Sequence, residues 1–365
     1  MRLLYIIHAL SGGGAERVMA TLINEQVRQG HEIALLADLR ETPAYEIDRR
    51  INTYDISWGF PRKETNVWHK IYRQFRKMQN IRRTANQFRP DCVISFICEM
   101  NCYVVASLLF TKIPIICSEH TNVKVVLPRF ISIFRKLMYP LASAVTVLTR
   151  HDLELWRNKL NNVVYMPNPM SNIPPSGQTK RERTILAVGR LNVWHTKGFD
   201  NLIRCWGQLC DEFPEWTLKI AGAGDIESTA YLKSIAEECH AKNVVFLGFR
   251  KDIIHVMQSS SIFCLSSRYE GLPMVLIEAM SSGCCCVAFN CETGPDEIIL
   301  HEHNGLLAID QNNDDLVLQL RRVLSDSRLR DELALNAQRT MNKYSLERIS
   351  TRWNILFQKV LKKEK

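Results

Sequence analysis

The feature that most constrains the fold is an alternation of short apolar strands with helical segments, which occurs twice along 365 residues. Such alternation implies a parallel sheet with helices on both faces. In the first half, the expected strands are Arg2–Leu10, Glu32–Ala37, Cys92–Phe96, Pro114–Ser118 and Val145–Leu148. In the second half, they are Thr184–Val188, Thr217–Ala221, Val244–Leu247, Ile262–Leu265 and Cys284–Phe289.

A polar stretch at residues 171–183 contains two adjacent prolines and separates the two halves. We expect it to be a linker between two Rossmann-like α/β domains, residues 1–170 and 184–345. A chain of this length suits two domains of ordinary size. Residues 346–365 carry apolar side chains at helical spacing and are expected to form a last helix.

Cysteine content and hydropathy indicate the compartment. The chain has 12 cysteines and no CxxC pair, so we expect reduced, buried thiols in a cytosolic protein rather than a disulfide or zinc framework. No segment approaches the roughly 20 apolar residues of a membrane span. The apolar run Leu3–Leu10 is interpreted as a first strand rather than a signal peptide.

Two carboxylates, Glu270 and Glu278, lie eight positions apart around a predicted strand-to-helix turn at Gly271-Leu272-Pro273. We expect Pro273 in the first helical turn and Glu278 about two turns into the helix, on nearly the same face as Glu270. A helix start presents unpaired N–H groups that suit a phosphate or a sugar hydroxyl, and the carboxylates could accept hydrogen bonds from sugar hydroxyls. The alternative is that Glu270 caps the helix and Glu278 is a surface residue.

Two cations follow the first strand of the second half, Arg190 directly and Lys197 at the start of the next helix. Both are expected at the carboxyl edge of the sheet, where an Arg fork and a Lys point charge together would clamp a pyrophosphate. Solvated loop residues are the alternative. His120 ends a strand of the first half and is expected to point toward the interdomain cleft, with a packing or capping role as the alternative.

A glycine loop, Gly12-Gly13-Gly14, lies between the first strand and a helix whose first turn holds Glu16 and Arg17. Glycines there let the backbone approach a ligand closely. A dinucleotide fingerprint, with Asp38 as the ribose carboxylate, is the competing interpretation. Its third glycine is absent because Arg17 occupies that place.

Residues 66–86 form a basic segment that predicts an amphipathic helix, with Lys70, Arg73 and Lys77 along one stripe. Cations beside apolar side chains suit anionic lipid or a pyrophosphate head group. A solvated helix face is the alternative. Nucleic acid would fit the net charge of +9, but no nucleic-acid-binding module is recognisable.

Together, Gly13-Gly14-Ala15-Glu16-Arg17, Glu119-His120, Gly189-Arg190-Leu191 with Lys197-Gly198, and the EX7E spacing of Glu270 and Glu278 resemble the retaining GT-B glycosyltransferases of family 4. The resemblance implies two Rossmann-like domains with an interdomain cleft and a last helix that returns to the N-terminal, acceptor-binding domain. It implies that Arg190 and Lys197 neutralise the donor pyrophosphate, that Glu278 binds the ribose, and that His120 contacts the donor sugar. It assigns the remaining donor contacts to Gly13, Gly14, Glu16, Arg250, Glu270, Gly271, Leu272, Pro273, Met274 and Val275.

Within that family the chain is most similar to bacterial N-acetylgalactosaminyltransferases that extend polyprenyl-pyrophosphate-linked oligosaccharides. Trp68-His69-Lys70-Ile71 and Ser118-Glu119-His120-Thr121-Asn122 carry this likeness. It implies that Lys70, Arg73 and Lys77 hold the lipid pyrophosphate.

We therefore expect a retaining hexosyltransferase that moves GalNAc or another hexose from a UDP-sugar to a lipid-linked precursor of a surface polysaccharide such as an O-antigen. Its expected partners are the donor, the acceptor and the inner membrane surface, without nucleic acid, metal or cofactor. The expected location is cytoplasmic and peripheral to the membrane. Alternatives are a lipopolysaccharide-core or soluble acceptor, a GT-B-like epimerase or hydrolase, and an NAD enzyme.

Overall fold

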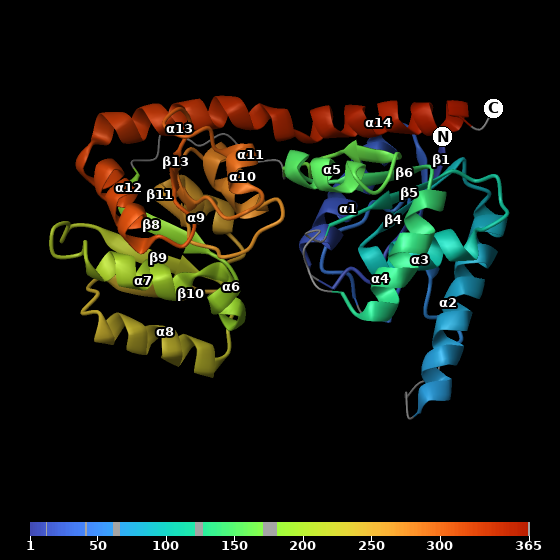
Figure 1. Ribbon diagram of the computed structural model, residues 1–365, viewed down its shortest axis with the longest axis horizontal. Helices are drawn as coiled ribbons and strands as arrows, with labels where there is room; N and C mark the ends of the chain where they lie inside the picture. The colour runs from blue at the N-terminus through green and yellow to red at the C-terminus, as the bar shows by residue number, and fades with distance from the viewer. Residues whose placement is uncertain (12, 41, 61–65, 121–126, 171–180, 364–365) are drawn as a thin grey trace. The chain divides into compact units, whose positions relative to one another are not determined.

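The computed structural model describes residues 1–11, 13–40, 42–60, 66–120, 127–170 and 181–363. The chain divides into two compact units (Figure 1). The first consists of Met1–Pro169 and Leu346–Lys365, and the second of Met170–Ser345. Most of the expected linker, Gly12 and the Thr121-Asn122 pair lie outside the described residues.

The first unit is built on a seven-stranded parallel sheet in the order β3-β2-β1-β4-β5-β6-β7. The order reverses between β1 and β4, which makes that point the topological switch of the sheet. The strands are β1 Arg2–Ile6, β2 Glu32–Ala37, β3 Asn52–Asp55, β4 Cys92–Phe96, β5 Ile115–Ser118, β6 Ala144–Val147 and β7 Val163–Tyr165.

Helices cover both faces of this sheet because its strands alternate their side chains between two cores. On β1, Leu4 and Ile6 enter one core and Leu3 and Tyr5 enter the other. The first core is completed from α2 Val67–Phe88, α3 Cys98–Ser107, η1 Tyr139–Leu141 and α5 Arg150–Arg157, with α4 Arg129–Met138 packed against it. The second is completed by α1 Gly14–Arg28 and α14 Leu346–Lys363.

The second unit contains a six-stranded parallel sheet in the order β10-β9-β8-β11-β12-β13. Its switch point lies between β8 and β11. The strands are β8 Glu182–Val188, β9 Thr217–Ala221, β10 Val244–Gly248, β11 Ser260–Leu265, β12 Cys285–Phe289 and β13 Leu306–Ala308. Its helices are η2 Leu191–Val193, α6 Trp194–Lys197, α7 Phe199–Gly207, α8 Ile226–Glu238, α9 Ile253–Ser259, α10 Met274–Ser281, α11 Pro295–Ile298, α12 Asn313–Ser325, α13 Ser327–Met341 and η3 Asn342–Tyr344.

The expected pair of parallel α/β sheets is confirmed, and each of the ten expected strands corresponds to an observed strand. The largest difference in bounds is at β1, which ends at Ile6 rather than Leu10. Three strands were missed, β3, β7 and β13. Each forms an edge of its sheet. β7 and β13 have only three residues and β3 is the polar run Asn-Thr-Tyr-Asp, so none of them carries an apolar run that can be distinguished from a loop.

All twelve cysteines are free thiols, and eleven of them are buried. None of the helices in the described ranges has both the length and the hydropathy of a membrane span.

Candidate functional site

The predicted cations and carboxylates of the second unit lie at the switch point of its sheet. Strands β8 and β11 are neighbours there. Arg190 follows β8 by two residues, and Glu270 follows β11 by five. The Arg190 side chain is exposed. Ligands of open parallel sheets bind at the carboxyl ends of strands where the strand order reverses.

Lys197 and Glu270 are in direct contact. The Lys197 Nζ lies 2.7 Å from the Glu270 Oε1, and the Ser267 hydroxyl donates to the same oxygen at 2.6 Å. Both ionic side chains are largely buried, with exposed fractions of 24% for lysine and 10% for glutamate. Two residues 73 positions apart in sequence therefore form one charged centre. The sequence had predicted only that both lie at the same edge of the sheet.

The backbone holds the two segments of this centre together. The Ser266 hydroxyl donates to the Lys197 carbonyl at 2.9 Å, and the Arg268 amide donates to the Thr196 carbonyl at 2.9 Å. Gly198 has a φ of +64°, and a Cβ there would lie 1.8 Å from the Ser266 carbonyl oxygen. Only glycine fits this approach, which explains the Lys197-Gly198 pair in the sequence.

A second ion pair beside the centre was missed by the sequence analysis. The Arg268 guanidinium donates to both carboxylate oxygens of Asp200, at 2.8 and 2.7 Å, and to the His195 carbonyl at 2.6 Å. Both side chains are less than one-fifth exposed. These hydrogen bonds to the Asp200 carboxylate raise the pKa of Arg268. Asp200 lies three residues after Lys197, and Arg268 lies two residues before Glu270. This closeness in sequence to the predicted site residues is the feature that could have indicated the ion pair.

The turn after Glu270 differs in register from the prediction. Pro273 is the N-cap, and α10 begins at Met274, so the helix starts one residue later than expected and Glu278 lies in its second turn rather than two turns in. Glu278 is 2% exposed, which excludes the surface-residue alternative. The Thr293 hydroxyl donates to the Glu270 carbonyl, and Gly294 packs against the Gly271 carbonyl oxygen, so this turn is braced by the loop after β12.

Arg250 lies beyond the edge strand β10, on the same side of the sheet but two strands from β8. Its guanidinium pairs with Asp252 through two hydrogen bonds, 2.8 Å from Nε and 2.6 Å from the terminal nitrogen. The pair is exposed on both sides. The structure thus holds the Arg250 side chain on its own loop.

In the first unit, the described glycines cap α1. Gly13 is the N-cap, and its amide donates to the Glu16 carboxylate at 3.1 Å. The Tyr45 hydroxyl donates to the Gly13 carbonyl at 3.1 Å. Glu16 therefore has a structural role in capping the start of α1 at Gly13 and Gly14, and its ligand contact remains a prediction.

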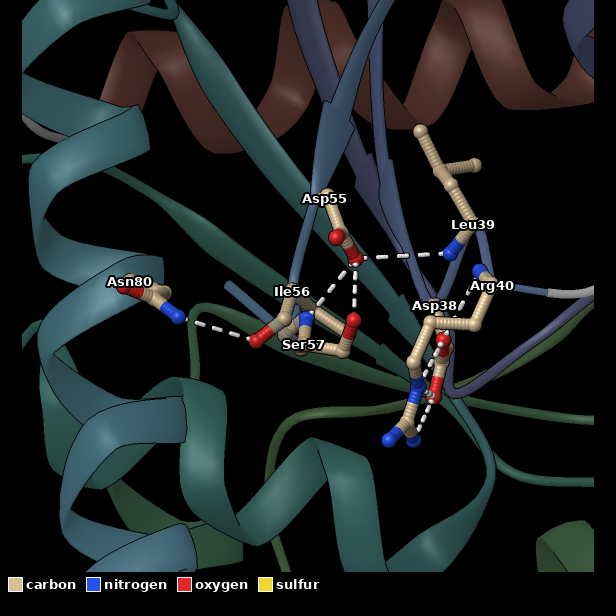
Figure 2. Close-up of polar contacts among 7 residues, drawn as sticks. All are labelled: Asp38, Leu39, Arg40, Asp55, Ile56, Ser57 and Asn80. Carbon is tan, nitrogen blue, oxygen red and sulfur yellow. Dashed lines mark hydrogen bonds and ion pairs between the residues drawn. The ribbon is translucent and has the colours of Figure 1, made fainter. Parts of the chain in front are cut away.

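The carboxylate required by the dinucleotide interpretation is already engaged. Asp38 receives the Arg40 amide at 3.1 Å and the Arg40 Nε at 2.9 Å (Figure 2). These bonds lower the pKa of Asp38. Nearby, Asp55 accepts from the Leu39 and Ser57 amides. The polar groups at this edge order the loops after β2 and β3, which is a structural role.

His120 follows β5 and is held by its neighbours. Its Nε2 lies 3.1 Å from the Ser118 hydroxyl, which also accepts from Thr146, and its ring stacks on Phe96 with centroids 4.6 Å apart. Burial lowers the pKa of His120 to about 3, so the imidazole is neutral at physiological pH. Because Nε2 contacts Ser118, Nδ1 is the nitrogen through which this neutral ring of fixed orientation could donate to or accept from a ligand.

Lys70, Arg73 and Lys77 all lie on α2 as expected, but their exposure differs, and this corrects the expectation that Lys77 faces a ligand. Lys70 is exposed and Arg73 is partly buried. Lys77 is 4% exposed, with its ammonium 4.5 Å from the centre of the Tyr103 ring and 3.8 Å from the Glu99 carboxylate. Helix α3 packs against α2 and covers Lys77, so of the three cations only Lys70 and Arg73, nearer the start of α2, reach the surface.

Two family models match this chain and together span residues 12–340. The model described as Glycosyltransferase Family 4 matches residues 12–171, and the model described as Glycosyl transferases group 1 matches residues 171–340. The chain is a glycosyltransferase. Both halves of the expected resemblance are therefore confirmed at the level of the family, while the EX7E assignment remains a prediction.

Similar proteins support this assignment along the whole chain. An uncharacterized glycosyltransferase of Haemophilus influenzae is 29% identical over 96% of this chain and 97% of its own. A Campylobacter jejuni enzyme, named as an α-1,4-N-acetylgalactosaminyltransferase acting on a GalNAc-containing diphospho-undecaprenol, is 27% identical over 97% of each chain. The solved sucrose-phosphate synthase of Thermosynechococcus elongatus superposes with a TM-score of 0.81 at 16% identity, covering 99% of each chain. The GT-B fold of this glycosyltransferase is confirmed.

Proposed function

We propose that this glycosyltransferase is a retaining enzyme that moves GalNAc or another hexose from a UDP-sugar to a lipid-linked glycan precursor of a surface polysaccharide. The observation that carries the proposal is the contact between Lys197 and Glu270 at the switch point of the second sheet, with Arg190 on the neighbouring strand end. The acceptor class extends the name of the Campylobacter relative to this chain.

The charged centre suits the departure of a nucleoside diphosphate. Breaking the bond between the sugar and UDP leaves negative charge on the β-phosphate. The Lys197 ammonium and the Arg190 guanidinium bind that phosphate more tightly as its charge grows, and this favours the transition state over the ground state. Glu270 holds the ammonium before the donor arrives, and then accepts a hydrogen bond from a sugar hydroxyl.

Retention follows from a front-face reaction. The leaving phosphate takes the proton of the acceptor hydroxyl while the new glycosidic bond forms on the face that UDP leaves. This route requires neither a protein nucleophile nor a resident cofactor or metal. Among the described residues, no three His, Cys, Asp or Glu side chains gather in a way that could hold a metal ion.

The acceptor side is proposed to use the start of α2. Its exposed apolar ridge of Trp68, Ile71 and Phe75 lies next to Lys70 and Arg73, an arrangement that suits a lipid surface and a pyrophosphate. Lys77 is assigned a structural role between α2 and α3. On this proposal the enzyme works at the cytoplasmic face of the membrane as a peripheral protein.

The donor class is tested by thermal stabilisation of the purified protein with UDP, GDP, ADP, NAD and individual UDP-sugars in the presence of EDTA. A shift with UDP and one UDP-sugar, undiminished by EDTA, is expected. A shift with GDP or ADP alone would show that the donor is a sugar of that nucleotide rather than a UDP-sugar. A response to NAD alone would contradict the transferase chemistry.

The charged centre is tested by Lys197→Ala, with Lys242→Ala as a matched control. Lys242 also contacts a carboxylate at 2.7 Å, that of Asp211, but both partners are about two-thirds or more exposed. Removing one charge stabiliser from the centre is expected to lower turnover by about a hundredfold, whereas the control stays within a few-fold of wild type. Equal activities would remove Lys197 from the mechanism.

The acceptor proposal is tested by neutralising Lys70 and Arg73 together as glutamines. Loss of turnover with a lipid-linked acceptor, while slow hydrolysis of the donor persists, is expected. An epimerase or hydrolase working on the donor alone would be unaffected by the same change, and so would a transferase acting on a soluble acceptor.

A further inference from the structure

Helix α4 presents an apolar ridge to solvent. Phe130, Ile133 and Leu137 of α4, with Leu141 of η1, lie at spacings of three and four residues and so share one face. Their exposed fractions are 65%, 59%, 60% and 57%. No residue of α4 is buried within the described structure. We call these four residues the α4 ridge.

The adjacent stripe of the same helix, one residue further along the chain from each ridge position, is already seated on the protein. Ile131, Phe134 and Met138 pack against the core of the first unit, and the Phe134 ring meets the Tyr103 ring of α3 edge-on at 5.5 Å. A surface helix normally seats one apolar stripe and turns polar side chains outward. Because the apolar arc of α4 is wider than the stripe that packs on the core, and that packed stripe fixes the rotation of the helix, the α4 ridge remains as a second contact surface.

Charge identifies the occupant. Residues 127–151 contain no Asp or Glu, and neither do residues 66–90, which include α2. The ridge is flanked on α4 by exposed Arg129 and Lys136. A second copy of the chain would bring cations against cations, which opposes self-association. An anionic lipid surface accepts both the apolar side chains and the charges.

We propose that the α4 ridge docks this enzyme on an anionic bilayer, with Phe130, Ile133, Leu137 and Leu141 in the acyl boundary and Arg129 and Lys136 at the head groups. The inference rests on the proposed function, since a lipid-linked acceptor requires the enzyme to work at a membrane. It adds α4 as an attachment surface beside the exposed apolar side chains of α2, and leaves Lys70 and Arg73 of α2 to bind the acceptor.

The test is co-sedimentation of the full chain with vesicles of phosphatidylglycerol and phosphatidylethanolamine, compared with vesicles of phosphatidylcholine. The ridge variant is Ile133→Ser with Leu137→Ser. Its matched control is Leu318→Ser with Leu335→Ser, which changes two leucines of the other unit that are 52% and 49% exposed. A third variant, Arg129→Gln with Lys136→Gln, tests the charges.

Wild type and the control are expected to bind the anionic vesicles. The ridge variant should bind at least about tenfold more weakly, because two apolar side chains no longer enter the acyl region. The charge variant should lose its preference for anionic over neutral vesicles. Equal binding by the ridge variant and the control overturns the proposal, as does a wild type that binds neither vesicle. A concentration-dependent dimer abolished only in the ridge variant would assign the ridge to a second copy, and would overturn it as well.

Two further readouts separate this proposal from the proposed function. Thermal unfolding of each variant establishes that it is folded. Turnover with a water-soluble, short-chain acceptor should be equal in wild type and the ridge variant. Vesicle binding without turnover of any UDP-sugar would reject the proposed function and leave the docking surface standing, whereas turnover with no vesicle binding would do the reverse.

Discussion

Gly198→Ala is the sharpest test of the way the charged centre is built. Gly198 and Gly248 both have a φ of +64°, but a Cβ at Gly198 would lie 1.8 Å from the Ser266 carbonyl oxygen, whereas a Cβ at Gly248 meets nothing within 4 Å. Both alanine variants incur about 1–2 kcal/mol for the left-handed backbone. Only Gly198→Ala adds a steric conflict, which typically costs about 1–3 kcal/mol.

We therefore expect Gly248→Ala to lower the free energy of unfolding by about 1–2 kcal/mol, and Gly198→Ala by about 2–5 kcal/mol. At this size of unit, each kcal/mol corresponds to roughly 2–4 °C in the unfolding midpoint. The Gly198 variant should also lose activity, since the new methyl group pushes Lys197 away from Glu270. A misplacement of about 1 Å near the reacting centre costs on the order of a hundredfold in rate.

The assays are calorimetry of both variants and kcat/KM for the Gly198 variant, with donor saturation measured separately. Equal losses of stability in the two variants would show that the contact with Ser266 carries no energy. Full activity in a clearly destabilised Gly198 variant would show that the spacing of Lys197 and Glu270 does not matter for turnover.

Three further outcomes are expected. Asp200→Asn should destabilise the second unit by about 2–3 kcal/mol, because the largely buried Arg268 loses its counter-charge; a double-mutant cycle with Arg268→Met that gives no coupling energy would contradict this. The pKa of His120 is lowered on folding, so its contribution to stability is present above about pH 6.5 and is lost as the pH falls toward 3. Between pH 6.5 and 5.5 the loss approaches about 1 kcal/mol, and a His120→Gln variant with the same pH dependence would refute the assignment. Eleven of twelve thiols are buried and burial raises the pKa of Cys284 to about 12, so a thiol reagent should label Cys239 first in the native protein, and rapid labelling of several cysteines would argue against this packing.

The sequence predicted the architecture well because the interior strands of both sheets are largely apolar runs of four to seven residues. The same signal fails at three edge strands, because β7 and β13 have only three residues each and β3 is polar. Hydrophobic periodicity shows which residues are apolar, but it does not show that a very short or polar segment pairs with the edge of a sheet.

The site was predictable in part, for a different reason. Glycine and charge motifs marked Lys197 and Glu270, but their 2.7 Å contact depends on two backbone segments that meet only in the fold. Asp200 and Arg268 carried no motif and were missed. Lys77 was assigned to the site but is buried. Helical spacing places it on one stripe with Lys70, but spacing alone does not show that α3 covers Lys77.

The first unit can complete its folding only after the last helix, α14, has been translated. Five side chains of α14 complete the core beside β1 and α1: Ile349, Trp353, Leu356, Phe357 and Val360. They are the last part of that unit to be translated, after the whole of the second unit. The first unit therefore emerges from the ribosome with an uncovered apolar face, and a chain that terminates near residue 345 would keep that face exposed. Premature termination so late in the message should yield an aggregating product rather than a shortened enzyme.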